Sequence, residues 1–170
     1  MANMEWERCY DYEDIAELFE IVEPSTSVWD RDGMLKKHQD KYRCYMCKNE
    51  NEEVIAMGLM CWLNNNEVLH IDSFSLHPKI RGKGLAKYLF NKFLDYVNEE
   101  FSETKKYNGK LLIEVYTKNV EAWRKIMGVE ELEIKTKPIH LEEEVVIMGK
   151  GLQNNDEEVY SEWQEFQKQW

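Results

Sequence analysis

The sequence predicts a mixed α/β domain, and three observations carry this prediction. Three apolar runs with strand character lie between residues 42 and 76, separated by short polar turns. A long run with helical periodicity follows a glycine-rich segment at residues 81–86. Apolar strand-like runs and one short helical pattern then alternate as far as residue 152. Closely spaced strands with short polar turns favour antiparallel pairing, so we expect a mixed, predominantly antiparallel sheet flanked by helices.

The N-terminal part predicts one strand and two helices. We expect the first strand at residues 4–10. Residues 11–22 are typical of a helix, because Asp11 is a favourable N-cap and an apolar stripe follows, formed by Ile15, Leu18, Phe19 and Val22. The segment EPSTSVWDRDG then breaks the pattern, and residues 34–41 predict a short second helix.

The middle of the chain predicts three strands, a loop and a long helix. The polar turns KNENEE and NNNE separate the apolar runs YRCYMC, VIAMGLMCWL and VLHIDSFSL. The loop follows directly, at residues 77–84. We expect the helix over residues 84–101, because apolar residues recur every four positions from Leu85 to Val97.

The last part of the domain predicts a strand, a short helix and two more strands. The compact apolar run KLLIEVYT is typical of a buried strand. A short helix follows at NVEAWRKIMG, with Asn119 as its N-cap and Gly128 as its stop. The runs ELEIKTKPIHL and EEVVIMGKGL complete the order β-α-α-β-β-β-α-β-α-β-β.

The predicted domain is followed by a separate C-terminal segment. We expect residues 1–150 to form one domain, since a chain of 170 residues can bury a core of its own. Residues 151–170 predict an added amphipathic helix, on which one face carries Val159, Trp163, Phe166 and Trp170. Aromatic residues are enriched at subunit interfaces, so this helix packs either on its own domain or on a partner subunit of a homodimer.

The charge and hydropathy of the chain restrict its partners. The formal net charge is -11, which disfavours sequence-independent binding to nucleic acid or to an anionic membrane and is compatible with a cationic substrate. No run reaches the ~18 apolar residues that would cross a bilayer. The acidic N-terminus also lacks the pattern of a secretory signal, so we expect a cytoplasmic protein.

The four cysteines predict ordinary reduced thiols and no metal. Cys44 and Cys47 form a lone C-x-x-C, whereas a structural zinc site needs a second pair of ligands at motif spacing. The flanking residues have strand character, which would place these two side chains on opposite faces of a strand. Neither a zinc site nor a redox motif is therefore expected here.

The segment SLHPKIRGKGLA predicts an anion-binding loop. It is neither a P-loop, which needs G-x-x-x-x-G-K-[ST], nor a dinucleotide fingerprint, because Lys87 stands where the third glycine belongs. The first amides of the following helix lack intrahelical partners, and the helix dipole adds positive charge there. Gly82 and Gly84 allow close approach of the backbone, and cations are added by Lys79, Arg81, Lys83 and Lys87. These features suit a pyrophosphate.

The same loop resembles a known family. Residues 81–86, RGKGLA, match R-x-x-G-x-[GA], the pyrophosphate loop of the GNAT superfamily of acyl-CoA-dependent N-acetyltransferases, and the resemblance covers roughly residues 4–150. It implies that acetyl-CoA is the cosubstrate and lies where the fourth and fifth strands splay apart. The backbone of Phe74, Ser75 and Leu76 would then pair with the pantetheine arm. The pyrophosphate would be held by backbone amides of Arg81, Gly82, Lys83, Gly84, Leu85 and Ala86.

Three further roles follow from the resemblance and from the residues themselves. Asn119, with Ala122, resembles the N-x-x-A start of a helix whose asparagine contacts the cofactor arm, and it is equally a plain helix cap. His70 and Asp72 share one face of the predicted fourth strand. Family members often carry a base at such positions, so either residue is a candidate general base, and Asp72 can also orient His70 or attract a cationic amine.

The general acid and the acceptor site are less closely specified. The family often has a tyrosine about seven residues after the asparagine, where this chain has Ile126; Arg124 occupies the other usual position. Tyr116 and Tyr160 are the nearest substitutes, and solvent can also protonate the leaving thiolate. The acceptor site of the family lies near the first two helices, where Trp29, Asp30 and Asp32 would hold a cationic amine.

The sequence therefore predicts an N-acetyltransferase that moves an acetyl group from acetyl-CoA to a primary amine of a small molecule or peptide, by direct transfer in a ternary complex. No cysteine lies beside a motif histidine, so a covalent intermediate is not favoured. The alternative is a regulatory module of the same fold that binds acyl-CoA or a protein without turnover. A nucleotide-binding enzyme with an unusual loop is the third interpretation.

Overall fold

The computed structural model describes residues 4–10, 42–63, 68–100, 110–128, 130–136, 144–152, 161–162 and 165. The strands are β1 (Glu5–Cys9), β2 (Arg43–Lys48), β3 (Val54–Leu63), β4 (Val68–Leu76), β5 (Leu111–Tyr116), β6 (Glu130–Thr136) and β7 (Val145–Lys150). The helical elements are η2 (Pro78–Ile80), α2 (Ala86–Glu100), η3 (Thr117–Asn119), α3 (Val120–Ala122) and η4 (Trp123–Met127). Every strand expected from the sequence is present, and the last five residues of the strand expected at 131–141 lie outside the described residues.

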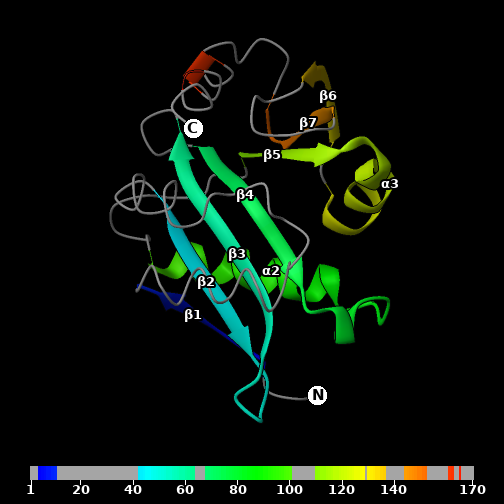
Figure 1. The fold of residues 1–170 in the computed structure, drawn as a ribbon. Coiled ribbons are helices and arrows are strands. Elements are labelled where there is room, and N and C mark those ends of the chain that lie inside the picture. Colours follow the sequence, from blue (N-terminus) through cyan, green and yellow to red (C-terminus); the bar gives the residue numbers. More distant parts are fainter. Residues whose placement is uncertain are drawn as a thin grey trace. The chain divides into compact units, whose positions relative to one another are not determined.

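The strands form a seven-stranded mixed sheet in the order β1-β2-β3-β4-β5-β7-β6 (Figure 1). β4 and β5 are parallel, whereas the pairs β1–β2, β2–β3, β5–β7 and β6–β7 are antiparallel. The predicted mixed, mostly antiparallel sheet with helices is thus confirmed. The chain divides into two compact units, residues 1–61 with 72–96 and residues 62–71 with 97–170.

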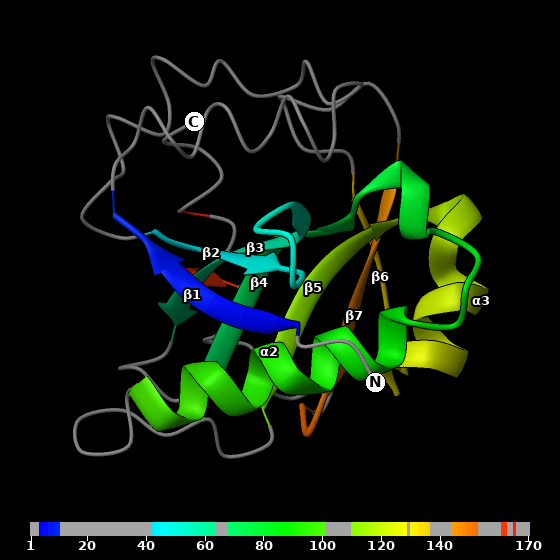
Figure 2. The same cartoon turned by 90° about the horizontal axis from the view of Figure 1, so that it is seen from below.

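In the first unit, α2 lies along one face of β1, β2 and β3 (Figures 1 and 2). The ring of Phe93 on α2 is the centre of this packing, with centroid distances of 5.2 Å to Trp6, 5.7 Å to Tyr45 and 5.6 Å to Phe74. The helix approaches β3 closely, because a Cβ on Gly58 would lie only 2.7 Å from Cε2 of Phe93. The apolar stripe predicted for residues 84–101 is therefore the buried face of α2.

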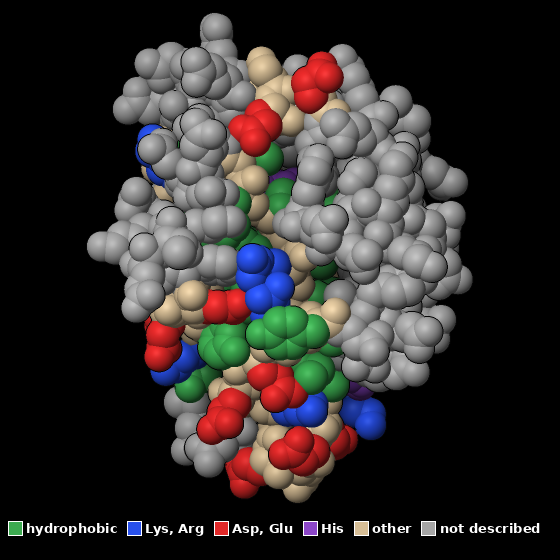
Figure 3. Space-filling model, turned by 90° about the vertical axis from the view of Figure 1, so that its left-hand side faces the viewer, with side chains coloured by type: hydrophobic (Ala, Val, Ile, Leu, Met, Phe, Trp, Pro, Cys, Tyr) green, Lys and Arg blue, Asp and Glu red, His purple; other side chains and the backbone are tan. Residues whose placement is uncertain are grey.

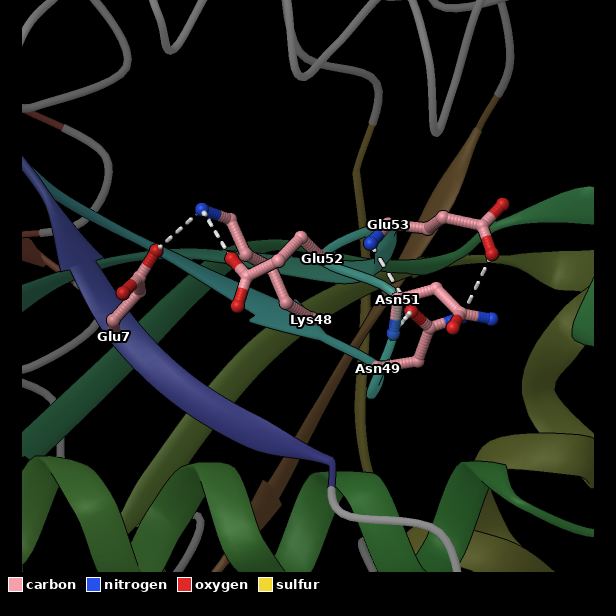
Figure 4. Close-up of polar contacts among 6 residues, drawn as sticks. All are labelled: Glu7, Lys48, Asn49, Asn51, Glu52 and Glu53. Carbon is pink, nitrogen blue, oxygen red and sulfur yellow. Dashed lines mark hydrogen bonds and ion pairs between the residues drawn. The ribbon is translucent and has the colours of Figure 1, made fainter.

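The turn between β2 and β3 is held by its own side chains (Figure 4). Asn49 Oδ1 accepts hydrogen bonds from the amides of Asn51 (2.9 Å) and Glu53 (3.0 Å). Lys48 Nζ lies 3.0 Å from a carboxylate oxygen of Glu7 and 3.7 Å from one of Glu52. In Figure 3, acidic side chains gather at the lower end of the described surface, with basic side chains among them. The run KNENEE thus forms the polar turn that its composition predicts.

In the second unit, the segment predicted as one short helix is built differently. After η3, only residues 120–122 are α-helical, and residues 123–127 form a π-helix. Gly128 ends this segment in the left-handed region at φ +69°, which confirms its predicted role as the stop. A π-turn differs from an α-turn by one residue of hydrogen-bond spacing, and hydrophobic periodicity over five residues does not distinguish the two.

Several predictions from the sequence lie outside the described residues. These are the helices at residues 11–22 and 34–41 and the greater part of the C-terminal helix, of which only Ser161, Glu162 and Glu165 are described. The alternative of a homodimer rests on that C-terminal helix and stays a prediction. No helix within the described ranges is both long and apolar enough to cross a membrane.

All four cysteines are buried free thiols, as expected. Cys44 and Cys47 both lie on β2, three positions apart, so their side chains point to opposite faces of that strand. Burial, together with the nearby Glu5 carboxylate, raises the pKa of the Cys47 thiol to about 12. Burial likewise raises the pKa of Cys44 well above its ordinary value of 9.0.

We expect the protein to lose stability as the pH rises from about 9 towards 12. Below pH 9.0 the Cys47 thiol is protonated in both the folded and the unfolded chain, so it adds no pH dependence there. Above that pH the unfolded thiol ionises while the folded thiol keeps its proton up to about 12, so the unfolded state is increasingly favoured. Urea unfolding at intervals of pH measures this effect.

The matched variant for this prediction is Cys47→Ala, whose free energy of unfolding should fall less steeply over the same pH range. Lys48 also holds its proton more tightly when folded, because its hydrogen bond to Glu7 raises its pKa, but it is present in both proteins and cancels in the comparison. Equal slopes for the two proteins would mean that the Cys47 thiol is not shielded from water.

Candidate active site

The predicted anion-binding loop joins β4 to α2 in the first unit. β4 ends at Leu76, η2 follows at residues 78–80, and the loop runs through residues 81–85 to the first turn of α2 (Figure 2). Phe74, Ser75 and Leu76 are half-buried, whereas residues 81–84 are exposed. The aromatic cluster supports this end of β4, because Phe74 packs edge-on against Phe90 at 5.1 Å. The loop therefore projects from a strand and a helix that pack against each other.

The two loop glycines have the geometry of a cradle for a ligand. Gly82 has φ +75° and Gly84 has φ +74°, a conformation that residues with a Cβ rarely adopt. A Cβ built on either glycine meets no heavy atom within 4 Å, so the space beside the backbone is open. The glycines are thus required by the backbone conformation of the loop and not by crowding inside the protein.

The start of α2 provides the electrostatic part of the site. The hydrogen bond from Leu89 N to Leu85 O (2.9 Å) is that of the first helical turn, and the amides before Leu89 have no helical acceptor four residues earlier. The first turn of α2, which is described throughout, contains no acidic residue, and Lys83 and Lys87 are exposed beside it. Amides, helix dipole and lysines together suit a pyrophosphate, which is the group that acetyl-CoA would present here.

The family resemblance predicts that the pantetheine arm of acetyl-CoA pairs with the backbone of residues 74–76, at the end of β4. The parallel pairs between β4 and β5 join Leu69, His70 and Ile71 to residues 111–113. Residues 74–76 lie further along β4 than these three pairs.

Asn119 occupies the N-cap position of α3, as the sequence predicts. Its side chain makes no capping hydrogen bond, so the expectation that it acts as a plain helix cap is wrong. The reason is local geometry: at φ -104° and ψ 0° its backbone continues the preceding η3 turn instead of adopting the extended conformation of an N-cap. The Asn119 side chain is exposed.

The candidate general bases are both on β4. His70 has no exposed surface, and among the described residues it is the one buried histidine or charged-type side chain in the core. It lies on the part of β4 that pairs with β5, opposite Leu112. Asp72 lies two residues further along the same strand, and its side chain is outside the described set.

The remaining predicted site residues are only partly placed. Trp29, Asp30 and Asp32 lie outside the described residues, as does Tyr160. Ile126, at the position of the family's tyrosine, is part of η4, and Tyr116 ends β5. Arg124 is exposed and forms an ion pair with Glu121. Within the described ranges, no three His, Cys, Asp or Glu side chains gather as a metal ion would require.

The fold and this loop are those expected for the acetyltransferase (GNAT) family. A family model described as the acetyltransferase (GNAT) family matches residues 5–124, and the chain belongs to this family.

Solved structures share the fold at low sequence identity. A variant of spermidine N-acetyltransferase SpeG from Vibrio cholerae is 16% identical over 86% of this chain and 92% of that chain, with a TM-score of 0.63. The ribosomal-protein-S18-alanine N-acetyltransferase from Escherichia coli is 13% identical over 88% of this chain and 92% of that chain, with a TM-score of 0.61. No curated protein sequence matched the chain.

Proposed function

We propose that this chain transfers an acetyl group from acetyl-CoA to a primary amine, by direct attack within a ternary complex. The observation that carries the proposal is the exposed loop in front of α2, in which Gly82 and Gly84 hold positive φ angles beside a helix start without acidic residues. Membership of the acetyltransferase (GNAT) family supports it. The proposal includes a cytoplasmic location, with which four free cysteines agree.

The proposed cosubstrate contacts follow the strand and the loop. The backbone of residues 74–76 pairs with the pantetheine arm, and amides of residues 81–86 hold the pyrophosphate. Asn119 contacts the arm through its side chain, which is exposed and makes no capping hydrogen bond. No role in this scheme requires a metal.

The proposed reaction removes two protons from the ammonium nitrogen and adds one to the leaving sulfur. The cosubstrate supplies the acetyl group as a thioester. The ammonium loses one proton to the general base, and the neutral amine forms a bond to the carbonyl carbon. As the carbon–sulfur bond breaks, the nitrogen loses its second proton to solvent and the thiolate takes up a proton from solvent. Asp72 removes the ammonium proton directly. His70, which is fully buried, acts through Asp72 or through a water molecule. A backbone amide of β4 donates to the carbonyl oxygen as negative charge develops there.

The acceptor is proposed to be a cationic amine, held by Trp29, Asp30 and Asp32. The net charge of -11 supports a cation. The two similar enzymes are named for spermidine, a polyamine, and for an alanine of ribosomal protein S18. These two amines are the first acceptors to test, as a small molecule and as a peptide that begins with alanine.

The proposal is tested by calorimetric titration with CoA and acetyl-CoA, with ATP and NAD as controls, followed by acetylation assays with both amines. Micromolar and CoA-selective binding with turnover is the expected result. Selective binding without turnover on a broad amine panel would favour the regulatory module. Absence of CoA binding would overturn the assignment of the loop.

The base is tested with Asp72→Asn and His70→Gln. Each change should lower kcat/KM by roughly hundredfold or more and leave the dissociation constant of CoA unchanged, because general-base catalysis typically contributes about 10²–10⁴ in rate. Loss of CoA affinity in step with loss of activity would mean that these residues maintain the fold of β4 and take no part in proton transfer.

A further inference from the structure

The turn that leads from β4 into the loop is held by backbone hydrogen bonds at its start. His77 N donates to the carbonyl of Ile55 on β3 (2.7 Å), and the His77 carbonyl accepts from Ile80 N (3.0 Å). His77 thus fixes where the chain leaves the sheet. The sequence singled out this segment for its glycines and cations and assigned no role to the histidine side chain.

The His77 side chain caps the η2 turn. Its Nδ1 accepts a hydrogen bond from Lys79 N at 3.1 Å, which places the ring proton on Nε2. Pro78 has no amide hydrogen, so Lys79 carries the first amide of η2 that needs an acceptor. The His77 side chain therefore accepts the hydrogen bond of the first N–H group in η2, that of Lys79.

The Arg81 side chain closes the same turn from its other end. Its Nε donates to the carbonyl oxygen of Leu76, the last residue of β4, at 2.9 Å. The chain thereby returns to the end of β4 immediately before Gly82. This contact uses the one guanidinium nitrogen that lies within the side chain, at the fourth atom from Cα.

We propose that His77 and Arg81 are positioning residues for the pyrophosphate loop: their side chains fix the turn from Leu76 to Arg81, and so preorganise the amides that bind acetyl-CoA. This inference rests on the proposed cosubstrate site. A loop that is already ordered loses less conformational entropy when the ligand binds. The ligand therefore binds more tightly. The proposal assigns the contribution of Arg81 to its hydrogen bond to Leu76, and the variants below separate that hydrogen bond from the positive charge.

Two substitutions at Arg81 separate the hydrogen bond from the charge. Arg81→Gln removes the charge but keeps an N–H donor at the same distance along the side chain as Nε. Arg81→Lys keeps the charge but puts a methylene group at that position. We expect Arg81→Gln to bind CoA within about threefold of the unchanged protein and Arg81→Lys to bind it roughly fivefold to tenfold more weakly, a loss typical of one cap or hydrogen bond.

A parallel pair tests His77. Asn is a favourable capping residue and retains an acceptor, whereas Leu has similar bulk without one. His77→Asn should preserve CoA affinity, and His77→Leu should lower it roughly fivefold. Hydrogen exchange at Lys79 N in the CoA-free protein should be faster in His77→Leu and unchanged in His77→Asn. This measurement reports the cap without any ligand.

A matched control separates positioning from general stability. Asn49 caps the β2–β3 turn in the same way, with Oδ1 accepting from two backbone amides, and it makes no contact with the loop in the hydrogen bonds described. Asn49→Ala should lower the melting temperature as His77→Leu does and leave CoA affinity unchanged. An equal loss of affinity in Asn49→Ala would overturn the positioning role.

The failures of this inference and of the proposed function are distinguishable. If the unchanged protein does not bind CoA, the proposed function fails. If it binds CoA, and Arg81→Lys retains affinity while Arg81→Gln loses it, the Arg81 charge contacts phosphate and the positioning role is wrong. If the rate of amide hydrogen exchange at Lys79 were equal in the two His77 variants, the capping role of the His77 side chain would also be wrong.

Discussion

Replacement of Gly84 by aspartate is expected to weaken the binding of CoA by roughly tenfold to hundredfold. Gly84 is exposed, has φ +74°, and lies two residues before the start of α2 at the proposed pyrophosphate site. A carboxylate there would repel the phosphates and compete for the first amides of α2. The fold itself should persist, because a Cβ at this position meets nothing within 4 Å. Calorimetric titration with CoA measures the effect.

The control for this prediction is Gly84→Asn, which has almost the same size and shape without the charge. Asn is among the residues that best tolerate positive φ, so backbone strain should be similar in the two variants. The difference between them reports electrostatic repulsion, and it should shrink as salt is added. If Gly84→Asp bound CoA as tightly as Gly84→Asn at low salt, the pyrophosphate would have to lie elsewhere.

Replacement of Phe93 by alanine is expected to cause the largest loss of stability in the first unit, about 3–5 kcal/mol. Phe93 is fully buried, and its ring contacts the aromatic rings of Trp6, Tyr45 and Phe74. The variant would leave a cavity between α2 and three strands that are fixed by their own hydrogen bonds. A loss of this size is a large fraction of the ~5–15 kcal/mol that stabilises a typical domain. Urea unfolding of both proteins measures it.

A double-mutant cycle with Gly58 tests the same contact. Gly58→Ala places a methyl group 2.7 Å from Cε2 and 2.9 Å from Cζ of Phe93, and we expect a cost of about 1–3 kcal/mol from overpacking. Phe93→Leu lacks those two ring atoms, so Gly58→Ala should cost less in that background. Strictly additive free energies would show that α2 and β3 can separate without penalty, contrary to the packing described here.

Sequence patterns were sufficient where the signal is local. β3 and β4 begin and end at the residues expected, because long apolar runs are bounded by polar, asparagine-rich turns. The stripe from Leu85 to Val97 predicted α2 for a similar reason, since Leu89, Phe93 and Val97, which recur at this spacing, are fully buried. Gly128 was identified as a stop because few other residues adopt its left-handed conformation.

The candidate site could be predicted only in part. The glycine-rich loop was found because glycines, cations and a following helix are adjacent in the sequence. The environment of His70 was not, because its burial depends on neighbours from other strands. The missing cap at Asn119 and the π-helix at residues 123–127 were not predicted either. They follow from backbone geometry that side-chain patterns do not specify.

The sequence by itself determined the order of the strands and helices along the chain, the anion-binding loop and the family. These depend on periodicity and on short motifs, in which each residue is close to the next. The tertiary structure alone decided which groups meet: Ile55 with His77, Arg81 with Leu76, and Gly58 with Phe93. Hydrogen bonds and van der Waals contacts require approach within a few ångströms, and that approach is fixed only when the strands have paired and α2 has packed on them.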